Sequence, residues 1–241
     1  MRDIKKNGHT MPSLSISNVF NVPCSQSFIT TFTQQSRQFN HTLESIIQDA
    51  RPSVVAITRE DQHIMKLIKP RSWHEYFKLF WRHSRYHKEI KGNLLLRRIG
   101  LQVPEIYETG IGLIPSARYG YLGFYIMENL EKRGFETVLD YFEDPELPQE
   151  QRQQLFDSIV SSLEKMRENL VLFNDLHLRN IMATPSGDMA WIDTGVTHFH
   201  WYSRKKFQNK FRSSVSRLIN CYDGSLFSQS EQQRLKALSE F

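Results

Sequence analysis

The chain has 241 residues, a formal net charge of +5, 39% hydrophobic residues and 24% charged residues. These values are typical of a globular protein with a real core, and the length suits one two-lobed unit or one or two ordinary domains. No stretch approaches the ~20 apolar residues of a membrane-spanning helix, and the first twenty residues lack the apolar segment of a secretory signal. The cysteines, Cys24 and Cys221, form no metal or disulfide pattern. We therefore expect a cytoplasmic protein.

The first half of the chain predicts an arm followed by strands. Residues 1–38 are rich in Ser, Thr, Asn and Gln without a sustained period, which predicts a poorly ordered arm. Three short runs then follow that are rich in β-branched residues and separated by turn-like segments, at 41–48, 54–60 and 63–69. These runs predict a three-stranded antiparallel meander.

A helix and two further strands are predicted next. Apolar residues recur near a helical period over residues 73–99, and Gly100 follows, which predicts one helix that ends at this glycine. Residues 103–114 and 120–130 are strand candidates. The predicted order is therefore three strands, a helix and two strands.

The second half is predicted to be mainly helical. An acidic helical region is interrupted near Pro145 and Pro148, and the apolar positions of 149–169 then trace one face of a helix. A strand–turn–strand follows, with a Pro-Ser-Gly-Asp turn between residues 180–184 and 189–193. The remainder, 200–241, is basic and helical in character.

Charge is distributed unevenly along the chain. Residues 66–98 hold ten Lys or Arg against two acids, residues 201–221 hold six against none, and residues 134–168 hold nine acids against three bases. The two basic zones indicate an anionic partner, either a nucleotide, a nucleic acid or a phosphate-rich membrane surface. A solvated basic face without a partner is equally consistent with either zone.

The strongest chemical signal is Asp175-x-x-x-x-Asn180, followed thirteen residues later by Asp193. A hairpin between Asn180 and Asp193 would bring three oxygen donors to one point. Phosphoryl transfer needs one carboxylate beside the attacking hydroxyl, and a carboxylate and an amide oxygen to hold Mg²⁺ against the nucleotide phosphates. Either motif alone is equally explained by a capped turn or a strand end, but their spacing favours Asp175 as base and Asn180 and Asp193 as metal ligands.

These motifs resemble those of a known family. Asp175–Asn180 (DLHLRN) and Trp191–Gly195 (WIDTG) resemble the kinase motifs H-R-D-x-x-x-x-N and D-F-G. The DLHxxN form is closer to that of bacterial small-molecule and lipopolysaccharide kinases. The segment 85–110 also looks like the helix and "G-x-x-VP" junction of lipopolysaccharide core kinases, which phosphorylate heptose or Kdo sugars. The resemblance spans residues 41–200 and implies an α+β, two-lobed protein-kinase-like fold.

The resemblance also assigns a lysine and a glutamate. Lys66 is flanked by apolar residues on the third predicted strand, where kinases carry the lysine that binds nucleotide phosphates and pairs with a helix Glu. Lys69 is the competing lysine, and an edge-strand position on a polar face is the other explanation for Lys66. Glu89 is the expected partner, with Glu75 as the alternative; an ordinary i,i+4 or neighbour pair of Glu89 with Arg85 or Lys88 is the other explanation.

Other segments of the chain match the kinase pattern in part and depart from it in part. Residues 124–130 resemble the hinge, so that Glu128 and Leu130 would offer main-chain groups to adenine. The usual Gly-rich phosphate loop is missing, since no glycine occurs between Gly8 and Gly92, and residues 48–53 take its place with Arg51 at the turn. Thr194 replaces the Phe of D-F-G, and Phe173 the usual His. The residues after Gly195 are too few for a protein-kinase activation segment and large C-lobe.

The C-terminal region carries two weaker patterns. His198 and His200 form an H-x-H without a nearby third ligand, which favours loop or core histidines over a metal site. The aromatic and basic segment 201–207 is consistent with a peripheral contact to an anionic inner-membrane surface, and equally with an ordinary helix whose Lys and Arg are solvated.

We therefore expect an arm at 1–38, a small antiparallel-sheet N-lobe at 39–130 and a reduced, mainly helical C-lobe at 131–241. The expected function is ATP- and Mg²⁺-dependent phosphorylation of a sugar hydroxyl of the lipopolysaccharide inner core at the cytoplasmic face of the inner membrane. The alternatives are a kinase with a protein or small-metabolite acceptor, and a pseudokinase acting as a binding module. Nucleic acid is not an expected partner, because a basic face without a reader motif is weak support.

Overall fold

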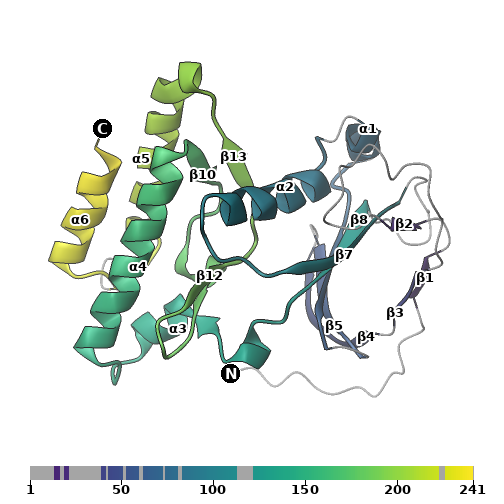
Figure 1. The fold of residues 1–241 in the computed structure, drawn as a ribbon, viewed down its shortest axis with the longest axis horizontal. Helices are drawn as coiled ribbons and strands as arrows, with labels where there is room; N and C mark the ends of the chain where they lie inside the picture. The colour runs from purple at the N-terminus through teal and green to yellow at the C-terminus, as the bar shows by residue number, and fades with distance from the viewer. Residues whose placement is uncertain are drawn as a thin grey trace. The chain divides into compact units, whose positions relative to one another are not determined.

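The computed structural model describes residues 14–16, 19–21, 39–41, 43–50, 53–59, 62–72, 74–80, 83–112, 122–222 and 226–240 (Figure 1). The protein is a mixed α+β chain with an antiparallel sheet and several helices. It divides into two units, the first made of residues 1–80 and 106–128 and the second of residues 81–105 and 129–241. Residues 81–105, which the sequence analysis placed in the N-lobe, group here with the second unit.

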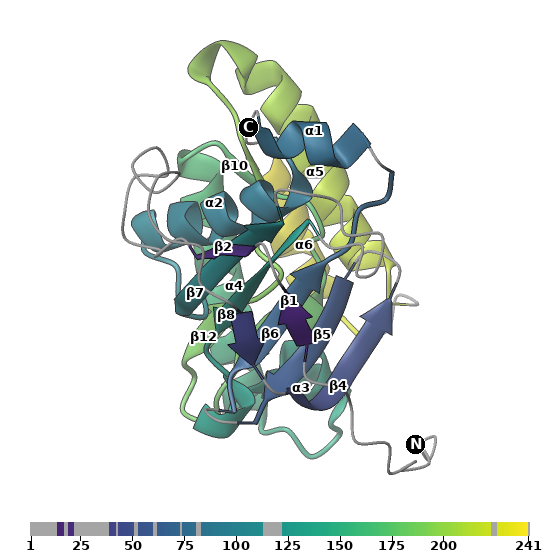
Figure 2. The same ribbon diagram turned by 90° about the vertical axis from the view of Figure 1, so that its right-hand side faces the viewer.

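The first unit is built around an antiparallel sheet whose strands lie in the order β2-β7-β8-β6-β5-β4 (Figure 2). The predicted meander and the two later strands are confirmed as β4 to β8. The six strands are β2 (Val19–Asn21), β4 (Leu43–Ala50), β5 (Ser53–Thr58), β6 (Ile64–Ile68), β7 (Ile106–Gly112) and β8 (Gly123–Met127). Because β6 lies between β5 and β8, both of its edges are hydrogen-bonded.

Short strands also occur where the sequence predicts an arm. β1 (Leu14–Ile16) pairs with β3 (Phe39–His41), and β2 pairs with β7 at the edge of the sheet. Strands of three residues carry too little alternation to be recognised from sequence. Most of the predicted arm lies outside the described residues.

The single helix predicted over 73–99 is wrong, because the structure has two helices there. These are α1 (His74–Phe80) in the first unit and α2 (Arg85–Arg98) in the second. Ser84 has an extended backbone, and its buried hydroxyl accepts a hydrogen bond from the His87 N–H, which caps a new helix. The predicted end is confirmed: Gly100 has φ +78°, and the Leu101 N–H donates to the Leu96 carbonyl.

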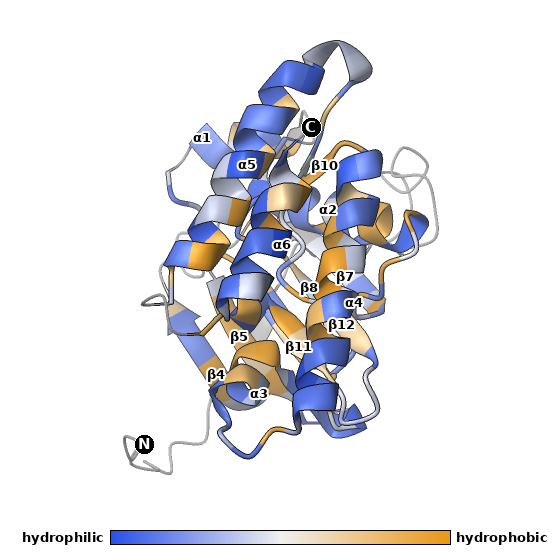
Figure 3. Cartoon of the chain, turned by 90° about the vertical axis from the view of Figure 1, so that its left-hand side faces the viewer, coloured by the Kyte–Doolittle hydropathy of each residue, from blue (hydrophilic) through white to orange (hydrophobic). Residues whose placement is uncertain are grey.

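The second unit packs helices against short strands. α4 (Gln149–Glu168) buries the apolar face that the sequence predicts, from Leu155 to Met166. α6 (Gln229–Ser239) lies against both α4 and α5 (Arg204–Asn220), and the three helices turn hydrophilic residues outward (Figure 3). The strands are β9 (Glu136–Thr137), β11 (Ile181–Ala183) and β12 (Met189–Trp191) in one sheet, and β10 (Val171–Phe173) and β13 (Val196–His198) in another; α3 (Val138–Glu143) packs on β11.

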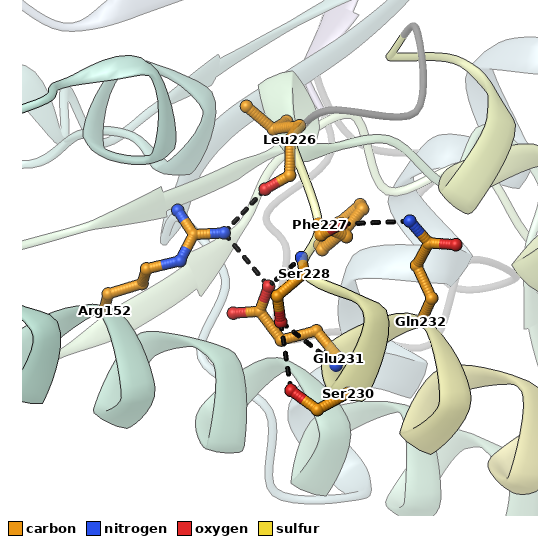
Figure 4. A network of polar contacts seen from close by, with 7 residues as sticks. All are labelled: Arg152, Leu226, Phe227, Ser228, Ser230, Glu231 and Gln232. Carbon is orange, nitrogen blue, oxygen red and sulfur yellow. Dashed lines mark hydrogen bonds and ion pairs between the residues drawn. The ribbon is translucent and has the colours of Figure 1, made fainter.

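A buried ion pair fastens α6 to α4. The Arg152 guanidinium donates to the Leu226 carbonyl (2.6 Å) and to the Glu231 carboxylate (3.0 Å), as Figure 4 shows. The same carboxylate oxygen accepts the Ser228 N–H (2.7 Å), and the Ser228 hydroxyl accepts the Glu231 N–H, which is a complete capping box. Arg152 also covers the Phe142 ring at 4.2 Å. Glu231 therefore both starts α6 and neutralises a largely buried arginine.

Among the described residues, no helix combines the length and the apolar character needed to cross a bilayer.

We expect Glu231→Ala to lower the free energy of unfolding by about 3 kcal/mol or more, because it leaves a buried guanidinium without its carboxylate and removes a cap. Asp157→Ala is the matched control, since Asp157 pairs with Arg234 at 2.6 Å while both side chains stay about half exposed. That pair is expected to contribute at most ~1 kcal/mol. Urea denaturation of both variants measures the difference, and equal losses would contradict the prediction.

Candidate active site

The ends of two paired strands bring the Asp175 and Asp193 segments together. In the antiparallel pair β10–β13, Phe173 lies opposite Val196. Beyond the strand, the Asn174 N–H donates to the Gly195 carbonyl (3.0 Å), and the Thr197 hydroxyl donates to the Asn174 side chain (2.8 Å). The chain that leaves β10 toward Asp175 therefore runs beside the chain that arrives from Asp193.

Asn180 closes the loop and joins it to the second segment. Its side-chain amide donates to the Asp175 carbonyl (2.9 Å), and its own carbonyl accepts the Ile192 N–H (2.9 Å), one residue before Asp193. Asn180 is 7% exposed, so these bonds fix a buried amide. Because the nitrogen is used within the loop, the amide oxygen is the atom that a cation could bind.

Asp193 has a backbone conformation that side chains rarely adopt. Its φ is +52°, in the left-handed region, where a residue other than glycine costs of order 1 kcal/mol or more. Asp is among the residues that tolerate this region best. The Gly195 N–H donates to the Asp193 carbonyl at 2.6 Å, which closes a tight turn around Thr194. Such strain at a carboxylate supports a functional role for this turn.

Helix α2 is clamped onto this turn by Thr194. The Thr194 hydroxyl donates to the Glu89 carbonyl (2.8 Å), and both residues are buried. The Thr194 carbonyl lies so close to Gly92 that a Cβ added there would be only 1.8 Å from the oxygen. Only glycine permits this approach. The threonine that departs from the D-F-G pattern thus supplies the hydroxyl that holds α2.

His177 lies beside the carboxylate of Asp175. Its Nε2 is 3.4 Å from an Asp175 carboxylate oxygen, while the Asp175 side chain stays 66% exposed. Within the described chain, His177 Nδ1 is buried without a hydrogen-bond partner. The Asp175 carboxylate therefore lies beside an imidazole and is still accessible to solvent.

Tyr222, which no sequence pattern predicted, supports the Asp175–Asn180 loop from the C-terminal part of the chain. The Leu178 N–H donates to the Tyr222 hydroxyl oxygen at 2.9 Å. Burial raises the pKa of Tyr222 to about 12. A tyrosine 44 residues from its partner and just after a basic helix leaves no signal in a single sequence.

Glu89 belongs to the second unit, where its carbonyl accepts the Thr194 hydroxyl. It is 3% exposed, and its carboxylate accepts from the Arg85 Nε at 2.9 Å, the neighbour pair that the sequence analysis kept open. The alternative, Glu75, lies on α1 and accepts the Arg71 N–H (2.9 Å). Lys66 belongs to the first unit and Glu89 to the second. The predicted pairing of the two therefore remains a prediction.

Lys66 is buried in the interior of its sheet. It pairs with Val55 and Tyr125 across neighbouring strands and is 6% exposed. The edge-strand explanation for this lysine is therefore wrong. Lys69, the competitor, lies past the end of β6 and pairs with Asp49. Lysine is rarely fully buried, so the burial of Lys66 distinguishes it from the partly exposed Lys69.

The predicted hinge lies at the boundary of the two units. Glu128 is the last residue of the first unit, and Leu130 is buried in the second. The Leu130 carbonyl already accepts the N–H groups of Arg133 (2.9 Å) and Phe135 (3.2 Å), so its own N–H is the better candidate for an adenine contact. The turn that replaces the Gly-rich loop contains Arg51, which lies outside the described residues.

No known protein family model and no curated protein sequence matches this chain. Over the described part of the chain, no group of three or more His, Cys, Asp and Glu gathers that could hold a metal. His198 and His200 have ring centroids 6.0 Å apart. A cation near Asp193 would therefore need the amide oxygen of Asn180 and oxygens from a bound ligand.

We expect Gly92→Ala to lower the free energy of unfolding by about 2 kcal/mol, because the new methyl group forces α2 away from Thr194. The sign is diagnostic, since the same change in an unobstructed helix gains ~1 kcal/mol. Leu94→Ala, at a 45% exposed position of the same helix, should change stability by less than ~1 kcal/mol. Chemical denaturation tests this, and a stabilised Gly92→Ala protein would show that no clamp exists.

We expect Tyr222→Phe to cost about 1–3 kcal/mol at neutral pH, because the Leu178 N–H loses its acceptor. The variant should also change how steeply the free energy of unfolding falls at alkaline pH. Tyr222 holds its proton more tightly in the folded state, so its contribution is fully present below pH ~10 and is lost as the pH rises to about 12.

Denaturation between pH 7 and pH 12 compares the parent, Tyr222→Phe and the exposed control Tyr202→Phe. The decline above pH ~10 should be shallower in Tyr222→Phe than in the other two proteins. An identical decline in all three would rule out a role for Tyr222.

Proposed function

We propose that this protein is an ATP- and Mg²⁺-dependent phosphotransferase with a kinase-like, two-lobed fold and an alcohol group as acceptor. The proposal rests on the hydrogen bonds that join the Asp175–Asn180 loop to the turn at Asp193. Asp175, Asn180 and Asp193 supply the oxygen donors that phosphoryl transfer requires, since the protein mainly positions the reactants and neutralises charge.

Each residue has a distinct proposed role. The exposed carboxylate of Asp175 orients the acceptor hydroxyl and takes its proton, while the hydroxyl oxygen bonds to the γ-phosphorus and the bond to the ADP oxygen breaks. The Asn180 amide oxygen and the Asp193 carboxylate would hold Mg²⁺, which supplies positive charge against the nucleotide phosphates. Lys66 binds these phosphates, Glu89 positions Lys66, and Glu128 and Leu130 contact adenine through the main chain.

The proposed acceptor is a sugar hydroxyl of the lipopolysaccharide inner core. Its support is the resemblance of residues 85–110 and 175–180 to the core sugar kinases. The exposure of Asp175 suits an acceptor that is part of a large molecule. Protein or small-metabolite acceptors are the alternatives within the same reaction class.

A pseudokinase that binds a nucleotide or a partner without catalysis is the second candidate. The observation that favours it is the absence of glycine from residues 48–53, where kinases use glycine main-chain groups to cradle phosphate. The intact Asp175, Asn180 and Asp193 favour the enzyme instead.

We expect ATP with Mg²⁺ to raise the thermal stability of the parent protein, because a ligand that binds only the folded state stabilises it by ~2.7 kcal/mol at a hundredfold excess over Kd. Asp193→Asn should lose this Mg²⁺-dependent shift. Asparagine also tolerates a positive φ, so the turn is kept. Asp188→Asn is the matched control, since it removes the same charge from the exposed turn at the other end of the β11–β12 hairpin.

Asp175→Asn separates the two candidates. For an enzyme, this variant keeps the nucleotide shift and loses transfer of labelled phosphate to a panel of core oligosaccharides, metabolites and proteins. A parent protein that shows the shift but transfers phosphate to none of them fits the pseudokinase. Absence of any shift at millimolar nucleotide contradicts the phosphotransferase and favours a pseudokinase that binds a partner.

A further inference from the structure

Two large aromatic side chains are exposed just before α5. Trp201 is 82% exposed and Tyr202 is 70% exposed, more than the other exposed large hydrophobic residues of the described chain. Both lie in the short 3-10 turn Trp201–Ser203. The Tyr202 ring stacks on His200 at 5.3 Å and meets the Trp201 ring edge-on at 6.0 Å. The rings therefore support one another in an exposed position, where apolar surface costs free energy unless it is covered by a partner.

The exposed side of α5 carries only basic and uncharged polar residues, the latter being Asn209, Ser213, Ser216 and Asn220. Its buried stripe consists of Phe207, Phe211, Ser214, Val215, Leu218 and Ile219. All six basic residues between 201 and 221 are exposed, and this segment contains no acid. Lys206 and Lys210 lie four residues apart on one row of α5, and Tyr202 lies in the 3-10 turn that precedes this helix.

The hollow beside Trp201 does not explain this surface. It has a volume of about 680 Å³, and its charged lining is Arg167 and Arg204 against Glu168 and Glu240. Two positive and two negative groups give no net attraction for an anion. Any attraction of an anionic partner to this region must therefore come from the exposed Lys and Arg residues of α5.

The position of the rings distinguishes between anionic partners. A single-stranded nucleic acid would stack bases on aromatic side chains placed along the basic face. On α5 the further aromatics, Phe207 and Phe211, are buried, and the exposed rings stand at one end only. Exposed Trp and Tyr beside Lys and Arg are typical of segments that lie at a bilayer surface.

We propose that Trp201, Tyr202 and the exposed basic residues of α5 form a docking surface for an anionic lipid bilayer. The rings enter the headgroup layer, and the Lys and Arg side chains contact lipid phosphates. This surface is separate from the residues assigned to phosphoryl transfer, and the proposal holds whether or not the protein is an enzyme.

Flotation of the full chain with vesicles tests the proposal. Vesicles of phosphatidylcholine with 30% phosphatidylglycerol should bind the protein, and vesicles of phosphatidylcholine alone should not. Binding should weaken as salt rises from 50 to 500 mM, because exposed charges are screened. The triple variant Lys205→Gln/Lys206→Gln/Lys210→Gln should bind about a hundredfold more weakly, since each of the three charges contributes about fivefold. Trp201→Ala/Tyr202→Ala should weaken the binding that remains at high salt.

Lys88→Gln/Arg97→Gln/Arg98→Gln is the matched control, because it removes three exposed charges from the other basic helix, α2. Binding of this variant should equal that of the parent, and Asp193→Asn should also bind normally. Equal weakening by both triple variants would overturn the proposal in favour of unspecific charge attraction. Failure to bind anionic vesicles would overturn it as well, and binding of poly(U) RNA in their place would assign the surface to nucleic acid.

Discussion

The contact between Thr194 and helix α2 is the constraint on which the second unit depends. One hydroxyl bond to the Glu89 carbonyl and one close approach to Gly92 fix the helix against the turn that carries Asp193. Because interiors are packed as densely as crystals, such an approach allows little adjustment on either side. The segment after α2 is fastened as well, since the Trp191 N–H donates to the Gln102 carbonyl and Asn93 donates to the Pro104 carbonyl, both at 2.9 Å. Helix α2 is thus held in place by the turn that carries Asp193.

This arrangement assigns different tasks to main chain and side chains in the proposed active site. Main-chain bonds from Asn174 and Asn180 to the Asp193 side of the hairpin hold the geometry. The Asp175 carboxylate, with His177 beside it, stays exposed. Tyr222 adds a support from a distant part of the chain and, through its raised pKa, keeps its proton under all ordinary conditions. Preorganisation of this kind is what a reaction dominated by positioning requires.

The sequence predicted strands β4 to β8 of the sheet, helix α4 and the hairpin between Asn180 and Asp193, because each has a sustained period or a spacing typical of its structure. It failed where the decisive interaction is local or distant. A single serine, Ser84, starts a new helix inside an apparently continuous pattern, and β2 is too short to show alternation. Within the candidate site, the sequence was sufficient to name the oxygen donors Asp175, Asn180 and Asp193. The roles of Gly92 and Tyr222 could not be predicted, because Gly92 contacts a residue 102 positions later and Tyr222 one 44 positions earlier.

The long separation along the chain between α2 and its partner turn also has a consequence for biosynthesis. Glu89 leaves the ribosome 105 residues before Thr194. At a synthesis rate of about 5–20 residues per second, α2 must wait several seconds or longer before the segment that holds it exists. During that interval the Thr194 turn that contacts α2 has not been made, and the intervening strands β7 and β8 can already join the sheet of the first unit. The nascent chain therefore completes its sheet early and its proposed catalytic half only after most of the protein has been translated.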